Sequence, residues 1–131
     1  MSRRTYLLLR RAILHLRPVA ATYQGRRRYL CPHVIGHTGG RPHVLCYQFA
    51  GESESGLAPD DPAANWRCMY VDELTDVSVR EGQWHTAWNY WQQTSCVEEI
   101  DVRAPWRLPA AVEKARRGPA GRRRAGSGRS G

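Results

Sequence analysis

Apolar residues near the start of the chain recur with the period of a helix. Between Tyr6 and Leu16 they fall on one face, while Arg10 and Arg11 fall outside it. The residue before a proline avoids the α region, so Pro18 is predicted to stop this helix. The apolar face comprises Leu8, Leu9, Ala12, Ile13 and Leu16.

After this helix, short β-type runs separated by turn residues predict five strands. They cover residues 19–24, 28–37, 43–49, 66–71 and 75–79. Gly39 and Gly40 predict a hairpin loop, and Pro32 demotes part of the second strand to an edge or a bulge. A helix followed by five short strands predicts a mainly β fold, a small SH3-like or Sm-like five-stranded barrel with an N-terminal helix.

Composition divides the chain into four segments. Trp84, Trp88 and Trp91 recur at a spacing that suits one helix face, and residues 97–102 are a candidate last strand. The Gly, Arg, Ser and Ala composition at the end buries too little surface to fold. We therefore expect an N-terminal helix (1–17), the barrel (18–82), a tryptophan-rich extension packing on it (83–110) and a disordered basic tail (111–131). The polar segment 51–65 is predicted to be a long functional or mobile loop.

The formal net charge of +8 lies mostly at the two ends of the chain, with a compact run at Arg26, Arg27 and Arg28. Positive ends favour polyanions, usually without sequence preference. Neither an apolar run long enough to cross a bilayer nor a signal-peptide core is found, so we expect a cytoplasmic protein with no membrane partner.

The four cysteines form no C-x-x-C pair, which argues against a zinc ribbon or a thioredoxin motif. Cys31, Cys46 and Cys68 lie in apolar runs and are predicted to be small buried side chains in a reducing cytosol. Neither a metal nor a cofactor is expected, because the spacing of the nearest ligand types matches no zinc pattern. Those ligand types are Cys31, His33, His37 and His43.

Several polar and aromatic side chains are candidates for contact with an anionic ligand. Arg67 offers a planar fork for phosphate, although an ion pair with Asp72 is the alternative. Gln48 carries the donor and acceptor that a base edge needs. Arg28, His33 and Ser53 are further polar candidates, while Tyr23 and Trp66 either stack on bases or fill the core.

Four short motifs occur in the chain in a fixed order. They are Y-x-G-x-x-R at 23–28, P-H at 32–33, Y-Q-x-x-G-x-S at 47–53 and W-R at 66–67. In this order they resemble short members of the WYL domain family, over roughly residues 5–80. The chain keeps the tyrosine of the Trp-Tyr-Leu tripeptide as Tyr47, and has Glu73 where many members carry an arginine.

This resemblance implies a stand-alone ligand-sensing module that binds nucleic acid or a nucleotide-like ligand and regulates a partner protein. Residues 1–17 are too short for the winged-helix domain that usually precedes such modules. The candidate ligand-binding set is Tyr23, Arg28, His33, Tyr47, Gln48, Ser53, Trp66 and Arg67. Two alternatives stay open: a structural Sm-like subunit that forms homo-oligomers, and a thiol enzyme using Cys31 and His33, although the expectation is that the protein is not an enzyme.

Overall fold

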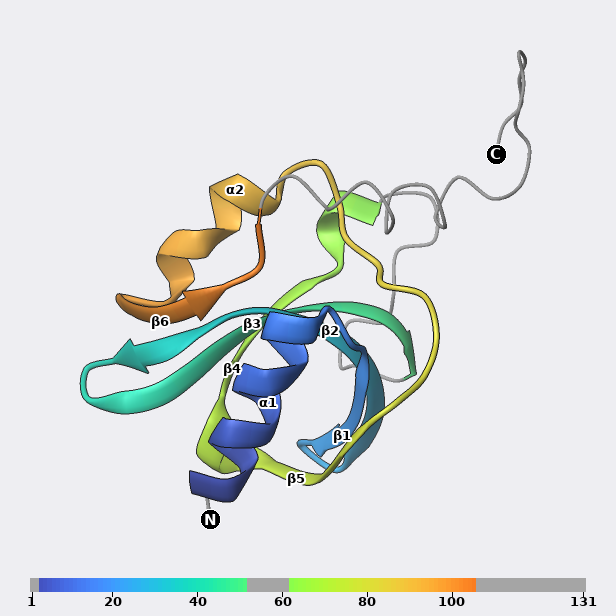
Figure 1. Cartoon of the computed structure of the whole chain (residues 1–131), viewed down its shortest axis with the longest axis horizontal. Helices are drawn as coiled ribbons and strands as arrows, with labels where there is room; N and C mark the ends of the chain where they lie inside the picture. Colours follow the sequence, from blue (N-terminus) through green and yellow to red (C-terminus); the bar gives the residue numbers. More distant parts are fainter. Residues whose placement is uncertain (1–2, 52–61, 106–131) are drawn as a thin grey trace.

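The computed structural model describes residues 3–51 and 62–105 (Figure 1). The predicted tail at 111–131, most of the predicted 51–65 loop and the candidate Ser53 lie outside these residues. The helices are α1 (Arg3–His15) and α2 (Tyr90–Gln93), with short 3-10 turns η1 (Pro62–Ala64), η2 (Val71–Glu73) and η3 (Thr94–Cys96). The strands are β1 (Val19–Tyr23), β2 (Arg26–Thr38), β3 (Arg41–Gly51), β4 (Trp66–Tyr70), β5 (Leu74–Val79) and β6 (Glu99–Arg103).

Helix α1 confirms the predicted amphipathic helix and begins three residues earlier than predicted. Leu9, Ala12 and Ile13 are buried, as the helical period predicts. The helix ends when Leu16 enters the left-handed region at φ 54°. The amide of Arg17 then donates to the carbonyl of Ala12 at 2.8 Å, which closes the helix before Pro18.

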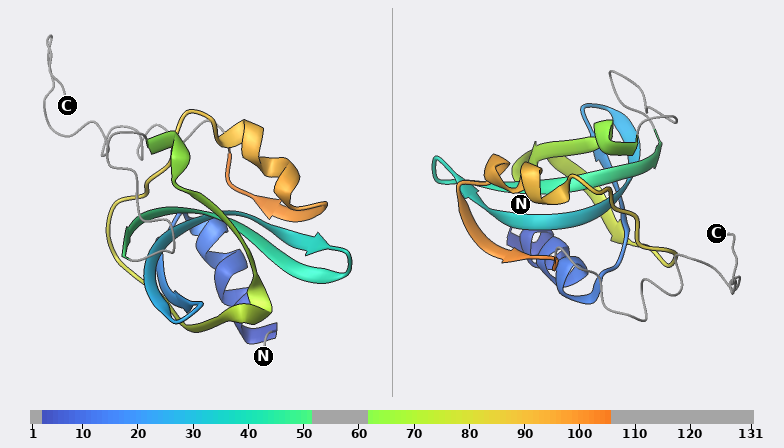
Figure 2. Two further views of the ribbon diagram at one scale, coloured as in Figure 1. Left: turned by 180° about the vertical axis from the view of Figure 1, so that it is seen from behind. Right: turned by 90° about the horizontal axis from the view of Figure 1, so that it is seen from above.

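All strands belong to one antiparallel sheet in the order β4-β3-β2-β1-β5, with β6 paired to β2. The mainly β class is therefore confirmed, and the sixth strand corresponds to the predicted last strand. Figure 2 shows the two longest strands, β2 and β3, curving along their length. The path from β4 to β5 is not closed by pairing between those two strands, so a closed barrel does not follow from the pairing.

Strand β2 changes neighbour halfway along its length. Its first half pairs with β1, through Leu30 opposite Val19, and its second half pairs with β6, through Ile35 opposite Val102. The register with β3 shifts between Pro32 and Val34, which confirms the predicted bulge. The hydrophobic core lies between this sheet and α1, which packs against β2, β5 and β6 (Figure 1).

The tryptophan spacing, which suits one helix face, does not mark a single helix: Trp84 and Trp88 precede α2, and Trp91 lies within it. Trp84 is buried, whereas Trp88 and Trp91 are exposed by 74% and 57%. Residues 80–89 form neither helix nor strand, and the amide of His85 donates to Cys31 Sγ at 3.2 Å. None of the described helices is long and apolar enough to span a membrane.

The cysteines also depart from the prediction. Cys68 is exposed and forms a disulfide with Cys96, whereas Cys31 and Cys46 are buried thiols. Within β4 the side chain of Cys68 points away from the core face that Met69 occupies, because successive side chains of a strand alternate. The apolar run around Cys68 therefore did not predict that this residue is exposed.

These positions predict how the cysteines react. In the native protein without reductant, a thiol reagent should label no cysteine, because burial raises the pKa of the Cys46 thiol, as does the nearby Cys31. Denaturation should expose Cys31 and Cys46, and a reductant should then release Cys68 and Cys96. Mass spectrometry after alkylation gives the count. Labelling of Cys46 in the folded protein would contradict its burial.

Polar contacts tie the start of α1 to β6. The Tyr6 hydroxyl donates to Asp101 Oδ2 at 2.7 Å, and Arg10 Nε donates to the same oxygen at 3.1 Å. The hydrogen bond from Tyr6 is the main cause that lowers the pKa of Asp101. Burial, followed by the bond to Asp101, raises the pKa of Tyr6 to about 12.

Replacing Tyr6 with phenylalanine should therefore cost about 0.5–1 kcal/mol near neutral pH. Because the pKa of Asp101 is lowered, this contribution is present above the ordinary carboxyl pKa of about 4 and lost as the pH falls. Because the pKa of Tyr6 is raised, it is also lost as the pH rises above about 10. Urea unfolding of both proteins across this pH range measures the difference. A difference independent of pH would show that Tyr6 acts through packing alone.

Candidate functional site

A hollow of about 560 Å³ lies between α1 and the end of β5. The amide of Arg80 donates to the carbonyl of Pro18 at 2.8 Å and so holds the end of β5 beside the residues that follow α1. Leu7 and Val79 are each exposed by 48% and form part of an apolar floor. The residues of this basic groove are Arg4, Leu7, Leu8, Arg11, Ala12, His15, Arg17 and Val79.

The charged side chains that line the basic groove are all basic. Arg4, Arg11 and Arg17 line it together with His15, and its lining includes no aspartate or glutamate. Among the described residues, the ion pairs involve Arg10 and Arg41 and none of these three arginines. Their charges are therefore not neutralised by ion pairs within the described part of the chain, and an anion entering the groove would be attracted by all three.

Unlike the arginines of the basic groove, Arg27 and Arg28 of the run at 26–28 bond within the protein. Arg28 is only 3% exposed, its Nη1 donates to Gln48 Oε1 at 3.4 Å, and its guanidinium lies 4.9 Å from the centre of the Tyr23 ring. Arg27 Nη1 donates to Thr22 Oγ1 and to the carbonyl of Asp76. The structure thus brings Tyr23, Arg28 and Gln48 together, with Arg28 and Gln48 buried and Tyr23 half-buried beside them.

His33 is buried in the bulge of β2. Its Nδ1 lies 2.7 Å from the carbonyl oxygen of Cys31, which can only accept, so Nδ1 carries the proton. Its Nε2 then accepts from Thr86 Oγ1 at 2.9 Å. The His33 ring also packs against Trp66 and Trp84, with 4.7 Å between ring centres in each pair.

Tyr47 and Trp66 belong to the same aromatic cluster as His33. Their ring centres are 5.1 Å apart, and Trp66 Nε1 donates to Asn89 Oδ1 at 2.8 Å. Tyr47 is buried and Trp66 is half-buried. The sequence alternative, in which the aromatic Trp66 fills the core rather than stacking on bases, agrees with these contacts.

Arg67 follows Trp66 on β4 and bonds to backbone carbonyls nearby. Its Nη1 donates to the carbonyls of Ala64 and Trp66, at 3.2 and 3.0 Å. Burial lowers the pKa of Arg67. Asp72, the alternative partner suggested by the sequence, instead pairs with Arg41 at 2.7 Å.

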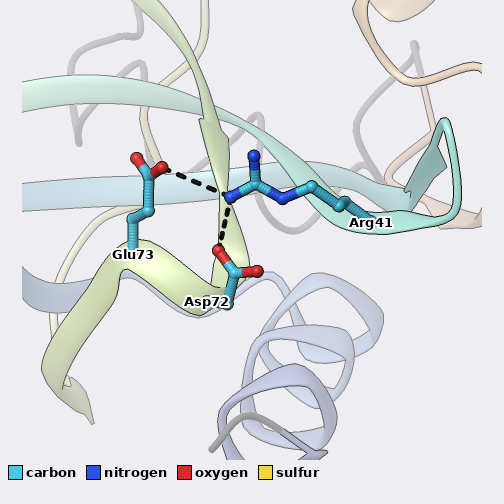
Figure 3. A network of polar contacts seen from close by, with 3 residues as sticks. All are labelled: Arg41, Asp72 and Glu73. Carbon is cyan, nitrogen blue, oxygen red and sulfur yellow. Dashed lines mark hydrogen bonds and ion pairs between the residues drawn. The ribbon is translucent and has the colours of Figure 1, made fainter.

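Arg41 forms a small ionic network at the surface (Figure 3). One nitrogen, Nη2, lies 2.7 Å from Asp72 Oδ1 and 3.3 Å from Glu73 Oε2. The guanidinium also stacks 3.7 Å from the centre of the Tyr70 ring. The hydrogen bond to Asp72 is the main cause that raises the pKa of Arg41. Glu73 therefore neutralises an arginine of its own chain here.

The basic groove was missed from the sequence. Arg4 and Arg11 are seven residues apart, two helical turns, and the same spacing separates Leu8 from His15. This periodicity was a usable signal for one wall. Arg17 and Val79 join it only through the pairing of β1 with β5, which sequence separation hides.

Comparisons of the chain with protein-family models, curated proteins and solved structures found no match.

Proposed function

We propose that this protein is a WYL-like sensing module with an SH3-like barrel, which binds a nucleic-acid-derived anion and regulates a partner protein. The observation that carries the proposal is the basic groove, where three arginines without ion pairs in the described chain surround an apolar floor. Arginine pairs with phosphate through charge-assisted bonds, and the leucines give the base or sugar an apolar surface.

The size of the groove favours a nucleotide or the end of a single strand. Its volume of about 560 Å³ falls within the range of ordinary small-molecule sites. The buried positions of His33 and Gln48 support a structural role for them. In this proposal the ligand therefore binds in the basic groove rather than at the eight residues suggested by the sequence. Arg67 stays a candidate for a second contact, since it is half-buried rather than enclosed.

Fluorescence anisotropy of the full chain with labelled single-stranded DNA and RNA tests the proposal. Nucleoside mono-, di- and triphosphates serve as unlabelled competitors, and heparin serves as a polyanion without bases. We expect a nucleotide or oligonucleotide to compete at physiological salt better than heparin of equal charge. Equal competition by heparin would mean that the chain only attracts polyanions through its net charge.

A further inference from the structure

One histidine and two cysteines from separate elements meet beside the β2–β3 hairpin. His43 lies on β3, Cys68 on β4 and Cys96 in η3, and their ligand atoms all lie within 4.8 Å of one another. His43 Nε2 is 3.3 Å from Cys68 Sγ. Two ligands of one tetrahedral zinc ion, at bond lengths of about 2.0 Å to nitrogen and 2.3 Å to sulfur, are themselves about 3.5 Å apart. The spacing therefore suits a single shared cation.

Hydrogen bonds fix which nitrogen of His43 faces the sulfur atoms. The Thr38 hydroxyl donates to the carbonyl of Cys96 at 3.3 Å and accepts from the amide of Glu98 at 3.2 Å. Having used its one proton, it accepts from His43 Nδ1 at 2.8 Å. Nδ1 thus carries the proton and Nε2 presents its lone pair to the sulfur atoms, as in zinc sites with an oriented histidine.

The surroundings hold the ring and leave the site accessible. His43 stacks on Tyr70 with 4.4 Å between ring centres, and Arg41 in turn stacks on Tyr70. His43 is buried, whereas Cys68 is exposed at the surface. A cation can therefore reach the sulfur side without disturbing the sheet.

We propose that reduction of the Cys68–Cys96 disulfide turns this cluster into a zinc site with His43 as the third ligand. The structure shows the oxidised state, in which both sulfur atoms are engaged with each other. Reduction by a phosphine transfers two electrons to the disulfide, yields two thiols and gives a phosphine oxide whose oxygen comes from water. Zinc then displaces the two thiol protons and binds two thiolates and Nε2, with a solvent molecule as fourth ligand.

The full chain, reduced with a phosphine and freed of excess reductant without oxygen, should bind one Zn²⁺ in competition with a chromophoric chelator. Cobalt should replace zinc and give a thiolate charge-transfer band with visible ligand-field bands. The oxidised chain should bind zinc at least about a hundredfold more weakly, because it offers no thiolate.

Variants separate this site from adventitious binding. Cys68→Ser, at an exposed position, should lower zinc affinity at least about a hundredfold, and Thr38→Val about ten- to a hundredfold. Cys46→Ala, which keeps all three ligands, should bind as the parent does, with circular dichroism to check its fold. Zinc binding that is unchanged by Cys68→Ser, or absent from the reduced parent chain, would overturn the proposal.

Discussion

Replacing Gly51 with alanine should lower the free energy of unfolding by at least about 3 kcal/mol, or prevent folding. Gly51 has a φ of 92°, a backbone conformation that residues with a side chain rarely adopt. A Cβ there would lie 2.5 Å from the carbonyl oxygen of Arg27 and 2.9 Å from Arg28 Cα. Both atoms are backbone of β2, opposite the end of β3. They can move only if the two central strands separate.

Gly25→Ala is the matched control for this substitution. Gly25 also has a positive φ, 73°, but a Cβ there meets nothing within 4 Å. The free energy of unfolding of Gly25→Ala should fall by only about 1 kcal/mol, the cost of the backbone conformation alone. Equal losses in urea unfolding of the two variants would show that β2 and β3 do not approach each other this closely at Gly51.

Reversing two charges in the basic groove should weaken ligand binding strongly. Arg11→Glu with Arg17→Glu replaces two phosphate partners by repulsive carboxylates, so we expect at least a roughly hundredfold loss in affinity, about 2.7 kcal/mol. The slope of binding against salt should also fall, because fewer counterions are displaced. Anisotropy titrations at several salt concentrations give both values.

Arg26→Glu with Arg103→Glu changes the net charge by the same amount outside the groove. Both side chains are at least partly exposed, so the fold should tolerate the change. This control should weaken binding only a few-fold through long-range electrostatics. An equal loss in the two double variants would assign the affinity to net charge rather than to the groove.

The fold followed from local signals to a large extent. Helical spacing predicted α1, and the missing amide of Pro32 predicted the bulge in β2. The disulfide could not be predicted, because Cys68 and Cys96 are 28 residues apart and meet only when η3 docks beside the hairpin. The tryptophan spacing did not reveal the conformation of residues 84–89, which are irregular and contact β2 through His85 and Thr86.

The candidate site was less predictable than the fold. Polarity marked His33 and Gln48 as ligand contacts, yet β2 and β3 are central strands and their polar side chains are satisfied inside. Arg28 likewise lies in the interior, since Gln48 and Tyr23 cover it. Which arginines face solvent depends on the packing of α1 against β5, a long-range contact that no local pattern encodes.

Mapping the bound ligand on the protein tests the central claim most directly. Backbone amide signals of the ¹⁵N-labelled full chain would be followed by NMR as the tightest nucleotide or oligonucleotide is added. We predict that the largest shifts fall on α1, on Arg17 and near Val79, the residues of the basic groove. Shifts concentrated around Arg67, or confined to the basic residues after 106, with α1 unchanged would contradict the account.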